Sequence, residues 1–255
     1  MLLAIDVGNT HTVIGLFDHD QLKQHWRLET QRERTADELG VLLLELFRVS
    51  GEQVDIDGII IANVVPPLQH ALQRLGERYF KTQPVFVDTR MDCGIRIKLD
   101  NPEEIGADRL VNAVAARHHV GQSAVIVVDF GTATTFDFIN EVGDYIGGAI
   151  APGILSSNEA LSKKASQLPR TDIRRPEKVV GTNTRESMQS GLYYGYVGLV
   201  DGLVDRIRSS VKVDPQVIAT GGLAGLISQE STTIQEVLPN LTLDGLYLIW
   251  QRLQN

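Results

Sequence analysis

The sequence predicts an α/β fold made of two similar lobes, each with a mixed central sheet flanked by helices. Strand-like runs rich in β-branched residues alternate with segments of helical periodicity along the chain. One strand–turn–strand pattern occurs twice, 123 residues apart, which is typical of an internal duplication. The 255 residues, 43% hydrophobic and 22% charged, are ordinary for one large or two small globular domains. We place the boundary near residue 118 and expect lobes over residues 1–118 and 119–255.

The duplicated pattern is a β-hairpin with a polar turn. The first copy is LLAIDVGNTHTVIGLF at residues 2–17, and the second is AVIVVDFGTATTFDF at residues 124–138. In each copy an apolar run ends in Asp-x-Gly, at Asp6 and Asp129, and small polar residues separate it from a second β-rich run. Such a turn between two strand-like runs is a hairpin signal.

Further helices and strands are expected in the first half. Thr35-Ala-Asp-Glu38 forms a capping box, which predicts a helix over Leu39–Val49. The remaining elements are a buried strand at Gly58–Val65, an amphipathic helix opened by Pro66 and Pro67, a short strand at Gln83–Asp88 and a helix that starts at Asn101–Glu104.

The second half is expected to follow a comparable order. Its predicted elements are a strand at Gly143–Ala151, a short helix at Ser156–Ala165, a long helix at Arg185–Val211, a buried strand at Gln216–Thr220, a tight turn at Gly221-Gly222, a helix start at Leu223–Ser228 and an amphipathic segment at Leu243–Leu253. The long helix contains Gly191, Gly195, Gly198 and Gly202. Each costs roughly 1 kcal/mol of helix propensity relative to Ala, so we expect close helix packing there, with a ligand-contacting surface as the alternative.

The two hairpin turns have the chemistry of anion-binding loops. A tight Gly turn after a strand exposes consecutive backbone N–H groups, and Asn9 and Thr10 add side-chain donors. Asp6 at the strand end can hold a hydrated Mg²⁺, which prefers one or two carboxylates together with phosphate oxygens. A single copy would be explained by an ordinary hairpin with a turn Asp. Two facing copies can instead clamp both ends of a polyphosphate, and we favour that interpretation.

The helix that follows Asn101 separates an apolar side from a polar side. At 100° per residue the apolar side comprises Ala107, Leu110, Val111, Val114 and Ala115, and the opposite side comprises Asp108, Arg109 and Asn112. Such a carboxylate can accept a hydroxyl proton, and the guanidinium can bind a substrate carboxylate through its planar fork. The alternative is a solvated polar face.

Composition excludes several other classes of protein. The net charge of −8 argues against broad nucleic-acid or anionic-membrane binding, because phosphate neutralisation needs clustered Lys and Arg. The single cysteine, Cys93, excludes an internal disulfide and a cysteine zinc cluster. No apolar run approaches the roughly 18 residues of a membrane helix, and no basic segment precedes the first strand, so we expect a cytoplasmic protein. The GxxxxGK[ST], GxGxxG, HExxH and GxSxG motifs are absent.

The ordered motifs resemble the acetate/sugar-kinase, chaperone and actin superfamily, whose fold is the duplicated actin-like or ribonuclease H-like ATPase fold. Within it the chain closely resembles type III pantothenate kinases over nearly its whole length. The matching motifs are DVGNT (Asp6–Thr10), EIGADR (Glu104–Arg109), DFGTATTFD (Asp129–Asp137) and TGG (Thr220–Gly222). The most specific is EIGADR, which the wider superfamily lacks.

The resemblance implies ATP-dependent phosphorylation of pantothenate to 4'-phosphopantothenate, the first step of coenzyme A biosynthesis. Asp108 would be the catalytic general base on the primary hydroxyl. Asp129 would bind the monovalent cation, K⁺ or NH₄⁺, that the family requires, and Mg²⁺ would accompany ATP. The residues implied to hold ATP are Asp6, Val7, Gly8, Asn9, Thr10, His11, Thr12, Val13, Gly131, Thr132, Thr220, Gly221 and Gly222.

The resemblance also implies a pantothenate pocket and a homodimer that completes it across the subunit interface. The pocket residues are Leu99, Gly106, Ala107, Asp108, Arg109 and Thr184. Arg109 would bind the pantothenate carboxylate. Leu99 is a departure, because family members often have a Tyr at this position; its hydroxyl and ring are lost here.

Two other functions compete with this one. A sugar or acetate kinase of the same superfamily would place its catalytic acid differently and would have no GADR helix. A non-enzymatic ATP-binding regulator is the second alternative, and the complete set of Asp6, Asp108, Asp129 and Thr184 argues against it.

Overall fold

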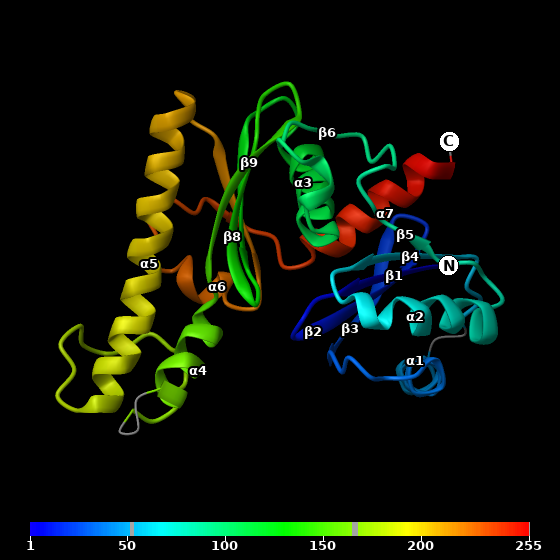
Figure 1. Cartoon of the computed structure of the whole chain (residues 1–255), viewed down its shortest axis with the longest axis horizontal. Coiled ribbons are helices and arrows are strands. Elements are labelled where there is room, and N and C mark those ends of the chain that lie inside the picture. The colour runs from blue at the N-terminus through cyan, green and yellow to red at the C-terminus, as the bar shows by residue number, and fades with distance from the viewer. Residues whose placement is uncertain (52–53, 165–167, 255) are drawn as a thin grey trace. The chain divides into compact units, whose positions relative to one another are not determined.

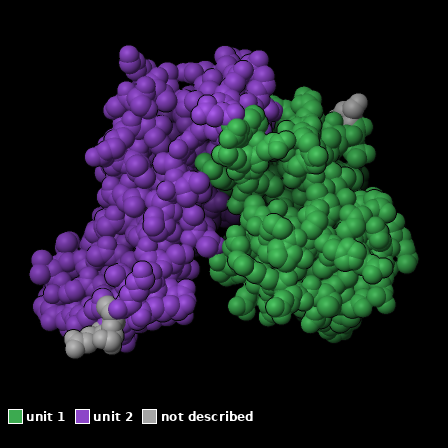
Figure 2. Space-filling model, viewed as in Figure 1, with its two compact units in different colours: residues 1–94, 101–115, 242–255 green, residues 95–100, 116–241 purple. Residues whose placement is uncertain are grey.

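The structure is a computed structural model that describes residues 1–51, 54–164 and 168–254. Two compact units divide the chain (Figures 1 and 2). Unit 1 comprises residues 1–94, 101–115 and 242–255, and unit 2 comprises residues 95–100 and 116–241. Among the described helices, none is long and apolar enough to cross a membrane.

The five-stranded sheet of unit 1 begins with the first predicted hairpin. Its strands are β1 (Leu2–Val7), β2 (His11–Asp18), β3 (Gln21–Glu29), β4 (Gly58–Asn63) and β5 (Val85–Phe86), in the spatial order β3-β2-β1-β4-β5. β1 pairs antiparallel with β2 and parallel with β4. The sheet is therefore mixed, as the sequence predicted.

The six-stranded sheet of unit 2 begins with the second predicted hairpin. Its strands are β6 (Arg96–Ile97), β7 (Val125–Phe130), β8 (Ala133–Ile139), β9 (Asp144–Pro152), β10 (Gln216–Gly221) and β11 (Glu236–Val237), in the order β11-β10-β7-β8-β9-β6. β7 pairs antiparallel with β8 and parallel with β10. Strands β7 to β11 thus repeat the order and direction of β1 to β5, which confirms the duplication.

The helices cover these sheets on their apolar faces. Those of unit 1 are α1 (Ala36–Ser50), α2 (Gln69–Leu75), a one-turn 3₁₀ helix at Pro66–Leu68, a π-helical turn at Gly76–Phe80 and α7 (Leu241–Gln254). Those of unit 2 are α4 (Ile154–Lys164), α5 (Thr184–Val211) and α6 (Ala224–Ile227). The predicted capping box at α1 is confirmed, because the Thr35 side chain accepts from the Glu38 N–H and the Glu38 carboxylate accepts from the Thr35 N–H. The final residue of the helix predicted to end at Ala165 lies outside the described residues.

The helix predicted to start at Asn101–Glu104 is interrupted. Pro102–Glu104 form a 3₁₀ turn, Ile105 is extended, and α3 (Ala107–Val120) begins two residues later. The Asn101 side chain donates to Glu104 at 2.8 Å instead of capping a longer helix. The GADR motif therefore lies on the first turn of its own helix.

The glycines of α5 do not pack closely against described parts of this chain. A Cβ added at Gly191, Gly195 or Gly198 would meet nothing within 4 Å, and one at Gly202 would meet only the Arg206 guanidinium at 3.1 Å. The prediction of close packing there is wrong within the described chain. The helix packs instead through Tyr193, Tyr196 and neighbouring apolar residues on the unit 2 sheet.

The C-terminal helix α7 belongs to unit 1, whereas the predicted lobe boundary placed it in the second lobe. Its contacts explain the assignment. Cβ atoms at Gly15 and Gly58 would clash with Leu243 and Trp250, and Phe17 stacks on Tyr247 with ring centroids 4.9 Å apart. By strand alternation these positions lie on the sheet face opposite the α1 and α2 core. The chain passes from unit 1 to unit 2 inside α3, between residues 115 and 116.

The single cysteine is structural. Cys93 is 3% exposed, and burial, the largest cause, together with the nearby Asp88 and Asp92 carboxylates raises the pKa of its thiol to about 11. Because the thiolate is the reactive form, this side chain is chemically inert near neutral pH.

A carboxylate on α5 fixes the loop after α6. Asp201 accepts hydrogen bonds from the Ser231, Thr232 and Thr233 hydroxyls at 2.6–2.9 Å and from the Thr232 N–H at 3.0 Å. Burial alone would raise the pKa of this carboxyl, but the hydrogen bonds outweigh it and lower the pKa.

We expect Asp201→Asn to lower the free energy of unfolding by about 1–3 kcal/mol at pH 7, because it removes the charge that these hydrogen bonds favour. A folded-state pKa below the unfolded value contributes stability above the unfolded pKa and loses it as pH falls through the folded pKa. Urea unfolding of wild type and variant at pH 7 and near pH 3 should therefore give a difference that shrinks in acid. A constant difference would contradict this account.

Candidate active site

The turn of the first hairpin is tight and exposed. The Gly8 N–H donates to the His11 carbonyl at 3.0 Å, and an added Cβ at Gly8 would lie 3.0 Å from the same oxygen, so the turn has little room for a side chain. Asn9 and Thr10 are exposed. The structure thus has a tight glycine turn with polar side chains exposed to solvent, and anion binding by this turn stays a prediction.

Contacts from the end of β3 and the residues after it anchor this turn. The Thr30 N–H donates to the Thr10 carbonyl at 2.9 Å, and the Thr12 and Thr30 hydroxyls lie 2.8 Å apart. The Arg32 guanidinium donates to the Asn9 side chain at 3.1 Å. Sequence reasoning missed Arg32, because the sequence predicted no strand at Gln21–Glu29 that would bring the segment after it to this turn.

The surroundings of His11 favour the neutral form of its imidazole. Burial, the largest cause, and the charge of Arg27 lower the pKa of its imidazole, while Glu29 opposes them. A neutral ring beside the turn can donate one hydrogen bond without adding a charge.

Asp108 lies on the first turn of α3, where Gly106 makes space for its carboxylate. A Cβ at Gly106 would come within 2.5 Å of Asp108 Oδ1, and that oxygen accepts the Arg109 N–H at 2.8 Å. The same Cβ position lies 3.6 Å from Val64, which follows β4. Because β4 pairs in parallel with β1, the start of α3 lies beside the strand ends that carry Asp6.

Asn112 is not part of the polar site face predicted for this helix. It is fully buried, and its side-chain oxygen accepts the Thr242 hydroxyl at 2.8 Å. Asn112 therefore joins α3 to α7, a long-range contact that helical periodicity could not indicate. Asp108 and Arg109 remain partly exposed.

The second hairpin in unit 2 brings Asp129 beside the TGG motif. Asp129 is aligned with Thr135 on β8 and with Thr220 on β10. Gly221 has φ = +90°, and an added Cβ there would lie 2.6 Å from Asp129 Oδ1. Only glycine fits both the backbone conformation and this close approach.

The second turn is anchored from α4. The Ser156 hydroxyl donates to the Thr132 carbonyl at 2.8 Å. A Cβ at Gly153 would clash with the Gly131 and Thr132 carbonyls, at 2.7 and 2.3 Å. The segment Gly147–Gly153 thus ends against the predicted phosphate loop, a contact that the sequence did not indicate.

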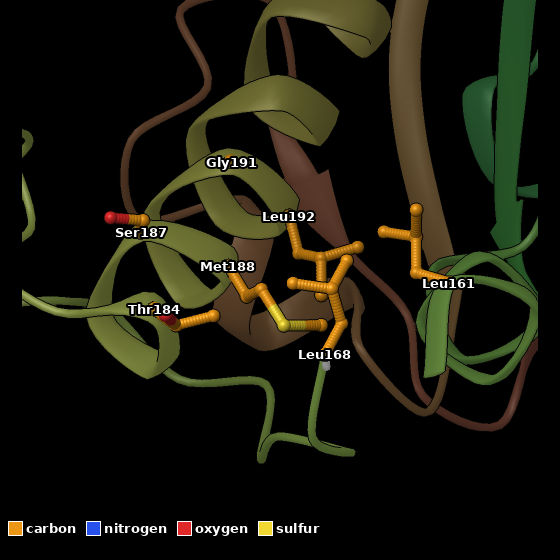
Figure 3. Close-up of a pocket in the computed structure, with 7 residues that line it drawn as sticks. All are labelled: Leu161, Leu168, Thr184, Ser187, Met188, Gly191 and Leu192. Atoms are coloured by element: carbon orange, nitrogen blue, oxygen red, sulfur yellow. The ribbon is translucent and has the colours of Figure 1, made fainter. Parts of the chain in front are cut away.

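Thr184 lies elsewhere in unit 2, at the first residue of α5. There it lines an apolar cavity of about 360 Å³ together with Leu161, Leu168, Ser187, Met188, Gly191 and Leu192 (Figure 3). Figure 3 shows the leucine and methionine side chains pointing toward one another. Asn183 caps α5 by accepting the Glu186 N–H at 3.0 Å.

Leu99 lies where β6 meets β9. The Lys98 N–H donates to the Tyr145 carbonyl at 2.8 Å, and a Cβ at Gly147 would lie 3.5 Å from the Leu99 side chain. Apolar contact with the β9 backbone replaces the hydroxyl that a Tyr would present at this position.

The predicted site residues form separate groups. Unit 1 brings together residues 6–13 and the Gly106–Arg109 turn, and unit 2 brings together Asp129, Gly131, Thr132 and Thr220–Gly222. Leu99 and Thr184 lie at two other places in unit 2. Among the described residues, no group of three or more His, Cys, Asp or Glu side chains could hold a metal ion. Single carboxylates at strand ends suit an ion that also binds phosphate oxygens.

Comparison with known families gives one consistent match. A family model described as type III pantothenate kinase matches residues 2–206. A curated relative from Geotalea uraniireducens (strain Rf4), named type III pantothenate kinase, is 53% identical over 255 residues, which covers 99% of this chain and 98% of the relative.

Solved structures give the fold. The ethanolamine utilization protein EutJ from Carboxydothermus hydrogenoformans superposes with a TM-score of 0.59 at 15% identity, covering 97% of this chain and 89% of that protein. The inorganic polyphosphate/ATP-glucomannokinase from Arthrobacter sp. strain KM superposes with a TM-score of 0.53 at 15% identity, covering 100% and 99%. With the duplicated sheets, these likenesses confirm the predicted duplicated actin-like fold.

Proposed function

Because the chain belongs to the type III pantothenate kinase family, it is an ATP-dependent phosphotransferase that phosphorylates pantothenate in coenzyme A biosynthesis, and we propose how its residues perform the reaction. The product is 4'-phosphopantothenate. The observation that carries the assignment of roles is the close approach of the Asp108 carboxylate to Gly106 on the first turn of α3.

Asp108 is the general base in this proposal. Its Oδ1 accepts the Arg109 N–H, which orients the carboxylate. In this proposal the carboxylate accepts the proton of the pantothenate primary hydroxyl. The hydroxyl oxygen forms a bond to the γ-phosphorus of ATP while the bond between that phosphorus and the β–γ bridging oxygen breaks, and ADP leaves. Phosphoryl transfer depends mostly on positioning and charge stabilisation, so this group needs only to orient the hydroxyl and to take up its proton.

The nucleotide binds through three glycine-containing turns. Residues 6–13 and the pair Gly131–Thr132 hold the phosphates, and Thr220–Gly222 approach the adenosine. The exposed turn after Gly8 and the anchored Thr132 turn support this assignment. Arg32, which bonds to Asn9, adds positive charge beside the first turn.

Two cations complete the site in this proposal. Asp6 ends a strand and suits Mg²⁺ that also binds ATP oxygens. Asp129 suits a monovalent cation, K⁺ or NH₄⁺, because its neighbours on the sheet are Thr135 and Thr220, whose hydroxyls are hard oxygen donors. Each ion supplies positive charge to the transferring phosphoryl group.

Pantothenate is bound by Leu99, the Gly106–Arg109 turn and Thr184 in this proposal. We also propose a cytoplasmic homodimer that completes this pocket and binds neither nucleic acid nor membrane. The open face at the α5 glycines supports the dimer. The net charge of −8 supports the lack of nucleic-acid binding. We keep as a proposal that the two duplicated lobes span residues 1–118 and 119–255.

Coupled measurement of ADP release tests the function. We expect release that requires pantothenate and that is strong in K⁺ buffer and weak in Na⁺ buffer. ADP release with glucose or acetate in place of pantothenate would favour another kinase of the superfamily. Nucleotide binding with no release under any of these conditions would favour a regulatory protein.

A further inference from the structure

A buried carboxylate that the proposed reaction does not use lies next to Asp129 on the unit 2 sheet. Asp137 is fully buried on β8. Thr135 and Asp137 are two residues apart on one strand and so face the same side of the sheet. Asp129 is the partner of Thr135 in the register with β7, and it therefore lies on that side as well.

Two hydroxyls donate to Asp137. The Tyr145 hydroxyl donates to Oδ1, and the Thr135 hydroxyl donates to Oδ2 at 3.2 Å. Tyr145 is fully buried on β9, so its ring is fixed. A threonine hydroxyl has one proton, and since Asp137 takes it, the Thr135 oxygen presents only lone pairs to its other neighbours.

This arrangement places two kinds of acceptor oxygen side by side. Residues directly opposite in an antiparallel pair have Cβ atoms about 4.5–5.5 Å apart, so the Thr135 and Asp129 side chains are neighbours on one face of the sheet. Hard oxygen donors of this kind are what an alkali-metal cation requires. Packing alone would not call for Asp137, because burying a carboxylate in a sheet is costly and an apolar side chain would fill the same space.

We propose that Asp137, held by Tyr145, is a positioning residue that fixes the Thr135 hydroxyl as a ligand of the monovalent cation at Asp129. The inference rests on the proposed function, since it concerns the cation of that site. Groups that hydrogen-bond to metal ligands fix their orientation, and their loss weakens metal binding.

The test compares the response to K⁺ of four purified full-length variants. In Asp137→Asn an NH₂ donor replaces one of the two oxygens that accept from Thr135 and Tyr145, and in Thr135→Val the hydroxyl is lost. We expect both to raise the half-activating K⁺ concentration about tenfold. Tyr145→Phe, which keeps the ring, should give a smaller rise in the same direction and serves if the other variants fold poorly. Asp201→Asn is the matched control, because it alters another carboxylate with hydroxyl partners outside the site.

A second measurement avoids turnover. The rise in Tm on replacing NaCl by KCl, in the presence of Mg²⁺ and a non-hydrolysable ATP analogue, should be reduced in the Thr135 and Asp137 variants and retained in Asp201→Asn. If Asp137 acts through Thr135, the double variant that combines Asp137→Asn with Thr135→Val should lose no more of the K⁺ response than Thr135→Val alone. Thr135→Ser should recover much of the response lost in Thr135→Val.

A lower Tm with an unchanged K⁺ response in Asp137→Asn would overturn the proposal and leave a purely structural role. A wild-type K⁺ response in Thr135→Val, or none in the wild type, would overturn it as well. These outcomes are distinct from failure of the proposed function, which would appear as wild-type protein that releases no ADP when pantothenate is added in KCl.

Discussion

Replacing Asp108 by Asn is expected to lower kcat by roughly 10²–10⁴-fold, the range for a lost general base. The amide keeps the shape of the side chain, and its oxygen can still accept the Arg109 N–H that orients the carboxylate at 2.8 Å. It cannot take up the proton of the pantothenate hydroxyl. Steady-state ADP release at saturating ATP and pantothenate measures the change.

The control for this variant is Glu103→Gln, which removes an exposed negative charge from the 3₁₀ turn just before α3. It should keep wild-type kcat, because Glu103 lies outside the proposed site. Unchanged Michaelis constants in Asp108→Asn would show that the substrates still bind. A kcat near the wild-type value would reject the role of Asp108 as base.

Local sequence signals predicted the parts of the fold that depend on neighbouring residues. The two Asp-x-Gly turns lie between antiparallel strands as expected, and the capping box at Thr35 starts α1. Each signal acts over a few residues, because turn geometry and helix capping are satisfied locally. The repeat of the hairpin then predicted two similar sheets, since each copy of the hairpin needs similar neighbouring strands to pair with.

Contacts between distant segments could not be predicted in the same way. Asn112 falls on the polar side of a helical wheel, but α7 arrives 130 residues later and buries it through Thr242. Asp137 ends the DFGTATTFD motif, but the motif does not indicate its hydrogen-bond partner, since its donor Tyr145 belongs to the next strand. A helical wheel or a strand pattern describes one element, and the burial of a polar residue depends on what another element places against it.

Glycines illustrate both cases. Gly221 is the last residue of β10, and its φ of +90° beside Asp129 explains why the TGG motif needs it. The α5 glycines looked like packing positions, yet the described chain leaves three of them open. The sequence shows where a glycine stands, but it does not show which neighbouring residue, if any, leaves no room for a side chain there.

Replacing Arg109 by Ala is expected to raise the KM for pantothenate by roughly 10- to 100-fold, the equivalent of one hydrogen-bonded charge pair. Arg109 follows Asp108 on the first turn of α3 and is partly exposed, so its guanidinium can reach a ligand beside the carboxylate. The kcat and the KM for ATP should change little, because the interaction is made equally in the ground state and in the transition state. Arg109→Lys should give an intermediate KM, since an ammonium keeps the charge but cannot form the two parallel bonds of a guanidinium.

A substrate without the carboxylate separates binding from indirect damage to the site. Pantothenyl alcohol carries a hydroxymethyl group in place of the carboxylate and keeps the hydroxyl that is phosphorylated. If Arg109 binds the carboxylate, wild type should use this alcohol poorly, and Arg109→Ala should lower its kcat/KM far less than that for pantothenate. An equal loss of kcat/KM for the two substrates would mean that Arg109 supports the fold of the α3 turn or the position of Asp108. A change confined to the KM for ATP would mean that Arg109 contacts the nucleotide.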